Sequence, residues 1–391
     1  MGSRADLGRY LATAGLARIA TEASGPAILL VTIAIVHDPA TGSYLVAGLT
    51  GAAAVAGPVV GAMLDRSARP RTGFAVSMAL FAVGLVALSL LIGHAPLGLL
   101  LGVALVTGLA YPALTGAWTA QLPGLVPASA LPRAYSADAG TYSAAAIVGA
   151  PLASALLVVS DRAPLWLPAA ALLISLAVLR LVPLRPRTAP ATHSILGDLR
   201  RGIATILQRI TLRQAFIITT ISFIGQAAIF VCTPLIAQAI SGSLAVSGVI
   251  LGAIAVGGVL GSTLLVRRPV RHPDRAVVVA TAMGGIGMLI AGLAHSLPIA
   301  VIGAFILGAS EAPQMSATFL VRNRESSPEV RAQVFTTAAS LRITAFAVGS
   351  ALFGAMLGLG TVVVMTTGAA LHWIAILLGV TFGARSLRGP A

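Results

Sequence analysis

Four ionisable residues lie inside long apolar stretches of the sequence. Arg18 and Glu22 interrupt the first stretch, Glu311 interrupts a late one, and Arg342 interrupts the one after it. A charged side chain near the centre of a bilayer costs at least about 2.5 to 3.5 kcal/mol, so such residues mark either charge pairs or a functional site. Since a desolvated carboxyl group holds a proton readily, the chemistry that these residues could perform is proton binding and release.

The spacing of the four residues predicts two charge pairs. Arg18 and Glu22 are four residues apart and share one face of a helix, although a base before an acid is the weaker orientation. Glu311 and Arg342 stand on neighbouring apolar stretches and could pair across helices. Two interpretations remain open. Either the pairs only hold helices together, or a glutamate binds a proton in one conformation and releases it in another while the nearby arginine sets its proton affinity.

The composition excludes a water-soluble fold. Hydrophobic residues make up 57% of the chain and charged residues 9%, and the mean hydropathy is +0.97, whereas about a quarter of the residues in soluble domains are charged. A spanning helix needs about 20 mostly apolar residues, and we expect twelve of them. They lie at 11–36, 43–64, 73–93, 97–121, 133–158, 164–183, 213–238, 244–266, 274–294, 297–321, 332–357 and 359–384.

The basic residues, which are all arginines, fix the expected topology. Nearly all of them fall in every second gap between the apolar stretches, and Arg162 is the exception. Cytoplasmic loops collect positive charge, so both termini are expected in the cytoplasm. Arginine without lysine is typical of a high-GC bacterial genome, which suggests the inner membrane of a bacterial cell. The net charge of +14 does not indicate nucleic-acid binding, because the arginines sit in short loops.

An internal repeat divides the chain. Residues 47–64 align with 247–264 and share the glycine pairs Gly48/Gly248, Gly57/Gly257 and Gly61/Gly261. Small residues let helices approach closely in lipid, so the pattern predicts a tight helix seam in each half; the alternative is a chance match between Ala- and Gly-rich helices. We expect one six-helix bundle at 1–183 and another at 213–391.

Residues 184–212 between the bundles form the longest hydrophilic stretch. Leu196, Leu199, Ile203, Ile206, Leu207 and Ile210 recur in it at helical spacing. The stretch is predicted to contain an amphipathic helix that lies on the cytoplasmic membrane surface. It could serve as a tether or as a regulatory partner site.

The segment after the second span reads Gly61-Ala62-Met63-Leu64-Asp65-Arg66-Ser67-Ala68-Arg69-Pro70-Arg71. It resembles the signature of the major facilitator superfamily, with matches at Gly61, Asp65, Arg66 and Arg69. The resemblance implies an all-α polytopic membrane protein of twelve transmembrane helices in two six-helix bundles. It also implies that this segment acts as a conformational latch, the alternative being a charged loop with a topological role only.

The same resemblance places spans one, four, seven and ten around a central cavity. Glu22, Gln226 and Glu311 would then face one aqueous chamber, although Gln226 could equally bond a neighbouring helix. Further candidates for substrate contact are Tyr111 and Gln314, with packing as their alternative role. Asp138 is another candidate and could instead bond backbone at a span end.

The likeness to drug:proton antiporters within that superfamily is partial. The arginine of their fourth span is absent from 104–108, and their glycine-proline motif survives only as Gly149-Ala150-Pro151. Leu125-Val126-Pro127 and Gly197-Asp198-Leu199-Arg200 resemble exporters of the siderophore and small-metabolite type. The chain is thus expected to be an exporter of the bacterial drug or metabolite efflux type.

These observations together predict a secondary active transporter that works by alternating access. We expect proton-coupled export, as in a multidrug antiporter, of small hydrophobic or weakly cationic molecules by a monomer in the lipid bilayer. An uptake permease or facilitator is the alternative, and a non-transporting sensor or assembly factor is the second one. No metal-ligand spacing, phosphate loop or nucleophile motif occurs, so no enzymatic activity and no cofactor besides protons are expected.

Overall fold

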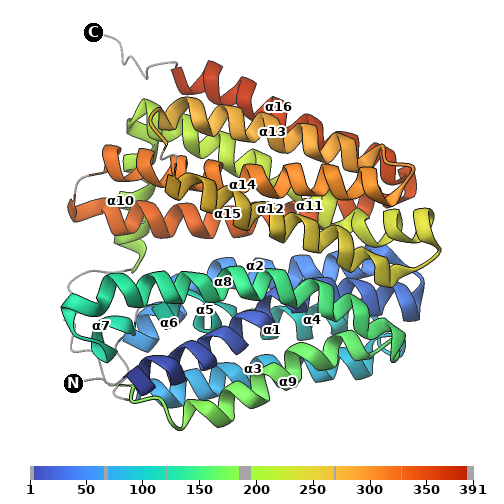
Figure 1. Ribbon diagram of the computed structural model, residues 1–391, viewed down its shortest axis with the longest axis horizontal. Helices are drawn as coiled ribbons and strands as arrows, with labels where there is room; N and C mark the ends of the chain where they lie inside the picture. Colours follow the sequence, from blue (N-terminus) through green and yellow to red (C-terminus); the bar gives the residue numbers. More distant parts are fainter. Residues whose placement is uncertain are drawn as a thin grey trace. The chain divides into compact units, whose positions relative to one another are not determined.

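The computed structural model describes residues 4–65, 69–119, 121–184, 195–267, 270–326 and 328–384. Within these ranges the regular structure is helical, with no β-strand. The chain divides into two compact units, Met1–Thr192 and His193–Ala391, and the helices of each unit run alongside one another (Figure 1).

The first unit contains helices α1 to α9. Six of them have twelve residues or more, and short helical segments follow α4 and α8. The bounds are α1 Arg4–Val36, α2 Pro39–Asp65, α3 Pro70–Leu91, α4 Leu97–Gly108, α5 Tyr111–Leu114, α6 Gly116–Thr119, α7 Leu122–Leu125, η1 Ala128–Ala130, α8 Leu131–Ala155, η2 Leu156–Val158 and α9 Ala163–Leu179.

The second unit contains α10 to α16. Its apolar core includes the fully buried side chains of Met288, Phe353 and Met365, contributed by three different helices. The bounds are α10 Ile195–Gln208, α11 Ile210–Ser241, η3 Leu244–Val246, α12 Ser247–Arg267, α13 Pro273–Gly292, α14 Leu297–Glu325, α15 Pro328–Met356, η4 Leu357–Leu359 and α16 Thr361–Ala384.

Eleven of the twelve apolar stretches expected to span the membrane fall mainly on one helix each, and the stretch 97–121 is divided among several. Within the described ranges, nine helical stretches are long and apolar enough to cross a bilayer, and α4 and α9 are shorter apolar helices. Large apolar side chains on them are exposed, among them Leu90, Val158 and Leu377. Such a surface is stable against lipid and unstable against water.

The two units repeat one pattern of helix neighbours. In the first unit α1 packs against α8 and α9, α9 packs against α3, and α2 packs against α4. In the second unit α11 packs against α15 and α16, α16 packs against α13, and α12 packs against α14. The equivalent helices therefore have equivalent neighbours, which is the arrangement that an internal repeat predicts.

Glycine makes the close helix contacts in this repeat. Gly261 of α12 lies so near α14 that a Cβ added to it would be 2.7 Å from the carbonyl oxygen of Ala309, and a Cβ added to Gly257 would lie still closer to the carbonyl oxygen of Phe305. In the first unit the tight contact is made by Gly108 of α4 against the Leu49 carbonyl of α2. Gly48 makes only ordinary van der Waals contact. The predicted close helix contact is confirmed in the second unit, where the glycines of α12 make it. In the first unit the close contact between α2 and α4 is made by a glycine of α4, not by the predicted glycine of α2.

The stretch at 97–121, expected to be one span, is interrupted. After α4 the chain continues as the short helices α5, α6 and α7, whereas α14 of the second unit is a single helix (Figure 1). Backbone hydrogen bonds between residues three apart, as in a 3₁₀-helix, occur here. The Ala113 amide donates to the Ala110 carbonyl, and the Trp118 amide donates to the Thr115 carbonyl. Pro112 and Gly116 explain the break, because proline lacks a donor and glycine is a poor helix former.

The amphipathic segment between the units belongs to the second one. Helix α10 packs against α15 and α11, and Ile206 is buried among Leu212, Val321 and Val334. Ile203 and Leu207 remain exposed. The helix therefore has one apolar side inside the unit and another on its surface, so the boundary between units lies before α10.

Candidate functional site

A buried salt bridge joins α1 to α8 in the first unit. The Arg18 guanidinium donates from Nη1 to Oδ1 of Asp138 at 2.7 Å and from Nη2 to Oδ2 at 3.1 Å. The Arg18 side chain is 0% exposed and the Asp138 side chain is 3% exposed. Burying two charges is costly, and the bidentate geometry of this pair is the one that best offsets the cost.

Neutral groups complete the surroundings of this pair. The Tyr10 hydroxyl donates to Oδ1 of Asp138 at 2.7 Å, and the Thr119 hydroxyl donates to Oδ2 at 2.7 Å. The ring of Tyr142 lies under the guanidinium, 3.7 Å from ring centroid to Cζ. Asp138 thus accepts four hydrogen bonds, as many as its two oxygens can take.

The observed salt bridge of Arg18 differs from the expected one. We predicted Glu22, one turn along the same helix, as its acidic partner, whereas the carboxylate held at 2.7 Å is that of Asp138, from another helix. A carboxylate on α8 can face the guanidinium with both oxygens. An acid four residues further along the same helix follows the base, which is the weaker orientation. Asp138 had been expected to contact substrate or span-end backbone, and its oxygens are occupied by side chains instead.

Glu22 lies one turn beyond Arg18 and is half-buried. Tyr111 of α5 interacts with Glu22 and with Thr21, so the expected neighbours of spans one and four do meet in this unit. On its other side α8 comes close: a Cβ added to Gly149 would be 3.2 Å from the Cβ of Glu22 and 3.1 Å from the Ala23 amide nitrogen. The Gly149-Ala150-Pro151 motif therefore lies against the helix turn that carries Glu22.

Glu311 in the second unit accepts a hydrogen bond from a neighbouring helix. The donor is the side-chain amide of Gln226 on α11. Gln226 therefore bonds to a neighbouring helix, which is one of the two roles expected for it. Gln314, one turn further along α14, donates to Thr281 at 2.7 Å and to Ser222 at 3.3 Å. These bonds form a polar seam between α11, α13 and α14.

Arg342 on α15 stacks on an aromatic ring. Its Cζ lies 3.7 Å from the ring centroid of Phe223 on α11, and Nη1 contacts the sulfur of Met315 on α14. Arg342, Glu311 and Gln226 are all half-buried. The structure thus brings these residues of α11, α14 and α15 onto one side of the second unit. The pairing of Arg342 with Glu311 stays a prediction.

The three membrane-embedded acids differ in accessibility. Asp138 is buried, whereas Glu22 and Glu311 are each half-buried. Proton exchange requires access to water, and a carboxylate held by an arginine and enclosed in protein lacks it. This difference could not be read from residue types, since all three acids stand in apolar stretches.

The residues of the expected latch lie at the junction of α2 and α3. Gly61 and Asp65 belong to the last turns of α2, and Arg69 precedes α3 at Pro70. Arg66 lies outside the described residues. The latching role of these residues therefore stays a prediction.

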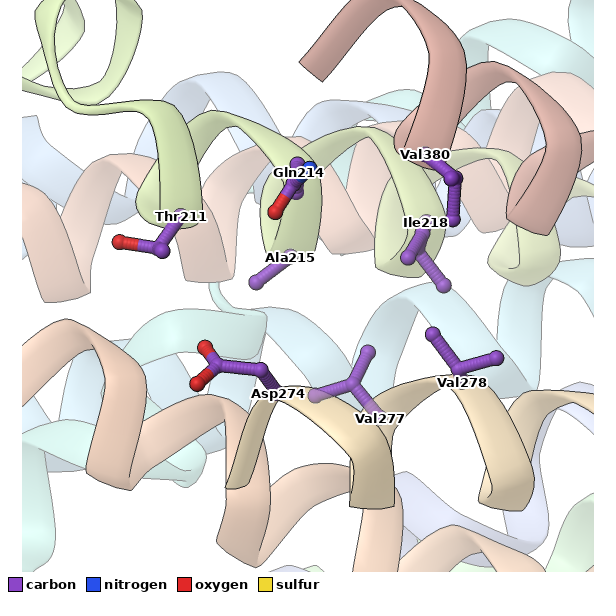
Figure 2. Close-up of a pocket in the computed structure, with 8 residues that line it drawn as sticks. All are labelled: Thr211, Gln214, Ala215, Ile218, Asp274, Val277, Val278 and Val380. Atoms are coloured by element: carbon purple, nitrogen blue, oxygen red, sulfur yellow. The ribbon is translucent and has the colours of Figure 1, made fainter. Parts of the chain in front are cut away.

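A hollow in the second unit lies between α11, α13 and α16. Thr211, Gln214 and Asp274 line its polar end, and valines and Ile218 line the other (Figure 2). Asp274 bonds Arg324 through both oxygens, at 2.8 and 3.1 Å. Sequence reasoning missed this pair. It links α13 to α14.

Neither unit offers a metal site among the described residues, where no three His, Cys, Asp or Glu side chains gather. Cys232 is a buried free cysteine.

Comparison with known proteins extends this description to nearly the whole chain. A family model described as the Major Facilitator Superfamily matches residues 10–353. The nucleoside transporter NupG has a similar structure, with a TM-score of 0.75, 14% identity and coverage of 97% of this chain and 99% of that one. No curated protein sequence matches significantly.

Two further solved structures are similar. One is a bacterial homologue of the human lysosomal transporter Spinster, in an inward-facing and unoccupied conformation, with a TM-score of 0.71, 13% identity and coverage of 98% of this chain and 97% of that one. The other is a POT family transporter in complex with a thioalcohol-conjugated peptide, with a TM-score of 0.76, 11% identity and coverage of 98% and 96%. At these identities the likeness shows the fold alone.

Proposed function

The chain belongs to the Major Facilitator Superfamily, and from this premise we propose that it is a proton-coupled exporter of small hydrophobic or weakly cationic molecules, working by alternating access. Family and fold confirm the expected class: a polytopic membrane transporter, not an enzyme, that needs no cofactor. The rest of the proposal concerns coupling, direction and substrate. It includes a monomer in a bacterial inner membrane with both termini in the cytoplasm.

The observation that carries the coupling proposal is the contrast between the acids. Glu22 and Glu311 are half-buried; Tyr111 lies near Glu22, and Gln226 donates a hydrogen bond to Glu311. Asp138 is enclosed and bound by Arg18. A half-buried carboxylate can gain or lose a proton as its surroundings change, and we assign this role first to Glu22 and second to Glu311.

The remaining charged residues receive other roles in the proposal. Arg18 joins α1 to α8 through Asp138, and this rigid junction positions the helix turn that carries Glu22. Arg342 holds a positive charge near Glu311 and sets its proton affinity. Gly61, Asp65, Arg66 and Arg69 latch the cytoplasmic ends of helices. Export of weakly cationic molecules follows from acids placed among Ala, Gly, Leu and Ile, because such surroundings recognise shape loosely and favour positive charge.

The test uses purified protein in liposomes with ethidium as the transported cation. With an imposed pH gradient, the wild type should accumulate ethidium, and Glu22→Gln should not. Counterflow exchange of ethidium without a gradient should persist in Glu22→Gln, because the site is intact and only coupling is lost. Glu325→Gln is the matched control, since Glu325 lies at the end of α14 and pairs with Arg324 at 2.9 Å; it should behave as the wild type.

Other results of this assay discriminate the alternatives. Unchanged pH dependence in both Glu22→Gln and Glu311→Gln would remove the coupling role from these residues. Wild-type flux that ignores the pH gradient but shows counterflow would indicate a facilitator. A protein that moves no solute of a broad panel would indicate a sensor or assembly factor.

A further inference from the structure

The hollow between α11, α13 and α16 has no part in the proposed transport mechanism (Figure 2). Its lining residues recur at helical spacing, so each of its two walls is one face of a helix. They are Thr211, Gln214, Ala215 and Ile218 of α11, Asp274, Val277 and Val278 of α13, and Val380 of α16. We call this feature the α11–α13 hollow.

The polarity of the α11–α13 hollow changes along its length. Thr211 and Asp274 stand in the first turns of α11 and α13, where the spans expected at 213–238 and 274–294 begin. Ile218 lies about 10 Å further along α11 than Thr211, at 1.5 Å per residue. Ala317 of α14 closes the floor, since it shares a buried cluster with Ile218 and Val277. The hollow therefore has a polar end at the membrane boundary and an apolar end within the hydrocarbon core, which matches the head and chain of a lipid.

The rim of the hollow adjoins a surface that contacts lipid. Val380 and Leu377 are almost one turn apart on α16, and their side chains are 49% and 61% exposed. On α13, Val279 follows the lining residue Val278 and is exposed as well. Large apolar side chains that are exposed on spanning helices face the lipid chains. A lipid chain can thus enter the hollow sideways from the bilayer.

The polar end carries an excess of positive charge. Arg209 is the N-cap residue of α11, and Arg271 and Arg275 stand on either side of the start of α13; all three are exposed. In the described part of the chain none of the three forms an ion pair with a carboxylate. Asp274, the acid of the lining, is neutralised through both oxygens by Arg324. This end therefore complements an anion, and guanidinium groups bind phosphate with two parallel hydrogen bonds.

The ends of the two wall helices add to this charge. Helices α11 and α13 both begin at the polar end, and neither has a side-chain hydrogen bond that caps its first turn. The first backbone N–H groups of a helix carry a partial positive charge and favour a nearby anion. The helix ends and the arginines thus favour the same sign of charge.

We propose that the α11–α13 hollow binds one anionic glycerophospholipid, from the leaflet that faces the cytoplasm in the proposed topology. The phosphate lies beside Thr211 and Gln214, within the positive field of the arginines. The first part of one acyl chain lies between Ile218, Val278 and Val380. A phosphatidylethanolamine fits less well, because its ammonium group adds positive charge beside the arginines. This site goes beyond the proposed function and is independent of the direction, the coupling and the substrate of transport.

The experiment titrates lipids onto the purified full-length protein, freed of lipid in detergent. Native mass spectrometry resolves the first bound lipid from later ones. Three probes are used: dioleoylphosphatidylglycerol, which is anionic; dioleoylphosphatidylethanolamine, which has the same chains and no net charge; and glycerol 3-phosphate, which has no chains. The wild type should bind the first phosphatidylglycerol at least about fivefold more tightly than the first phosphatidylethanolamine, the gain expected from one arginine near an anionic headgroup. It should not bind glycerol 3-phosphate at the same concentrations.

One variant with its control tests the charge of the polar end. Arg275→Gln removes an exposed arginine next to Asp274 and should weaken binding of the first phosphatidylglycerol about fivefold. The effect on phosphatidylethanolamine should be smaller, because the ammonium group of that lipid offsets its phosphate. Arg180→Gln is the control, since Arg180 is an exposed arginine at the end of α9 in the other unit. It should bind both lipids as the wild type does.

A second variant with its control tests the apolar end. Val380→Trp places a large ring at the rim and should weaken binding of both lipids at least about fivefold, because overfilling a packed site is unfavourable. Val363→Trp is the control: Val363 lies near the other end of α16, is 42% exposed and does not line the hollow. It should bind as the wild type does. Both valines are exposed, so neither substitution disturbs the core.

The proposal is overturned if the first phosphatidylethanolamine binds as tightly as the first phosphatidylglycerol. Binding of glycerol 3-phosphate as tight as that of phosphatidylglycerol would also overturn it, since the site would then bind a free anion. So would phosphatidylglycerol binding that is equal in Arg275→Gln and Arg180→Gln, or equal in Val380→Trp and Val363→Trp. These measurements contain no transport step, so the proposed function stands or falls separately.

Discussion

Replacement of Arg18 by methionine tests the salt bridge between α1 and α8. Methionine keeps much of the length of arginine and removes its charge. Asp138 then loses two hydrogen bonds, at 2.7 and 3.1 Å, and its carboxylate remains enclosed. Removing one partner from a buried ion pair costs about 3 to 5 kcal/mol, because the other charge is left without compensation. We expect the Arg18→Met protein to lose stability by this amount.

The Tyr10 and Thr119 bonds to Asp138 limit the loss to the lower part of this range. They are both 2.7 Å long and survive the substitution. A second substitution, Asp138→Leu, should then restore much of the lost stability, since replacing both charges of a buried pair by apolar groups is often neutral. The double variant therefore should cost less than the sum of the two single variants by at least about 2 kcal/mol.

The assay measures the free energy of unfolding of the purified protein in mixed micelles by denaturant titration. It compares the wild type, both single variants and the double variant. Arg324→Met is the control, because its pair with Asp274 has side chains 44% and 49% exposed and should contribute about 1 kcal/mol or less. The buried, coupled pair would be refuted if Arg18→Met lowered the free energy of unfolding no more than Arg324→Met does. It would also be refuted if the losses of the two single variants simply added in the double variant.

Three further substitutions test other contacts. Gly149→Val should lower the free energy of unfolding by about 1 to 3 kcal/mol, because the first added carbon already meets α1 at 3.1 to 3.3 Å. Gly140→Val on the same helix is the control, since nothing lies within 4 Å of it, and it should change the free energy of unfolding by less than about 1 kcal/mol. Equal losses in the two variants would contradict the contact. Asp274→Asn should lower stability by less than about 1 kcal/mol and only at low salt, so a loss that persists in high salt argues against an exposed pair. Gln314→Leu should cost about 1 to 3 kcal/mol because Ser222 and Thr281 lose their donor, and wild-type melting would show that the polar seam contributes nothing.

The positions of the spans could be predicted because hydrophobic length is a local property of the sequence. All expected stretches except 97–121 fall mainly on one helix each, and the glycine seam of the second unit follows from the spacing of Gly257 and Gly261. The break after α4 was missed. Its signals, Gly108, Pro112 and Gly116, were visible, but the apolar length of 97–121 outweighed them in the prediction.

Partners of charged residues could not be predicted, since they depend on contacts between helices. Arg18 pairs with an acid 120 residues away, although Glu22 was the nearest acid in the sequence. Residue types also cannot separate a sealed carboxylate from a half-buried one, which is the difference between Asp138 and Glu22. Tyr10 and Thr119 were missed for the same reason, because their role exists only where α8 meets α1 and α6.

The most direct measurement of the central claim is the proton flux that accompanies transport. Liposomes containing the protein and an internal pH-sensitive dye receive an ethidium gradient and no pH gradient. The proposed mechanism predicts that ethidium movement through the wild type drives protons in the opposite direction, and that Glu22→Gln moves ethidium without protons. Proton movement in Glu22→Gln equal to that of the wild type, at equal ethidium flux, would contradict it.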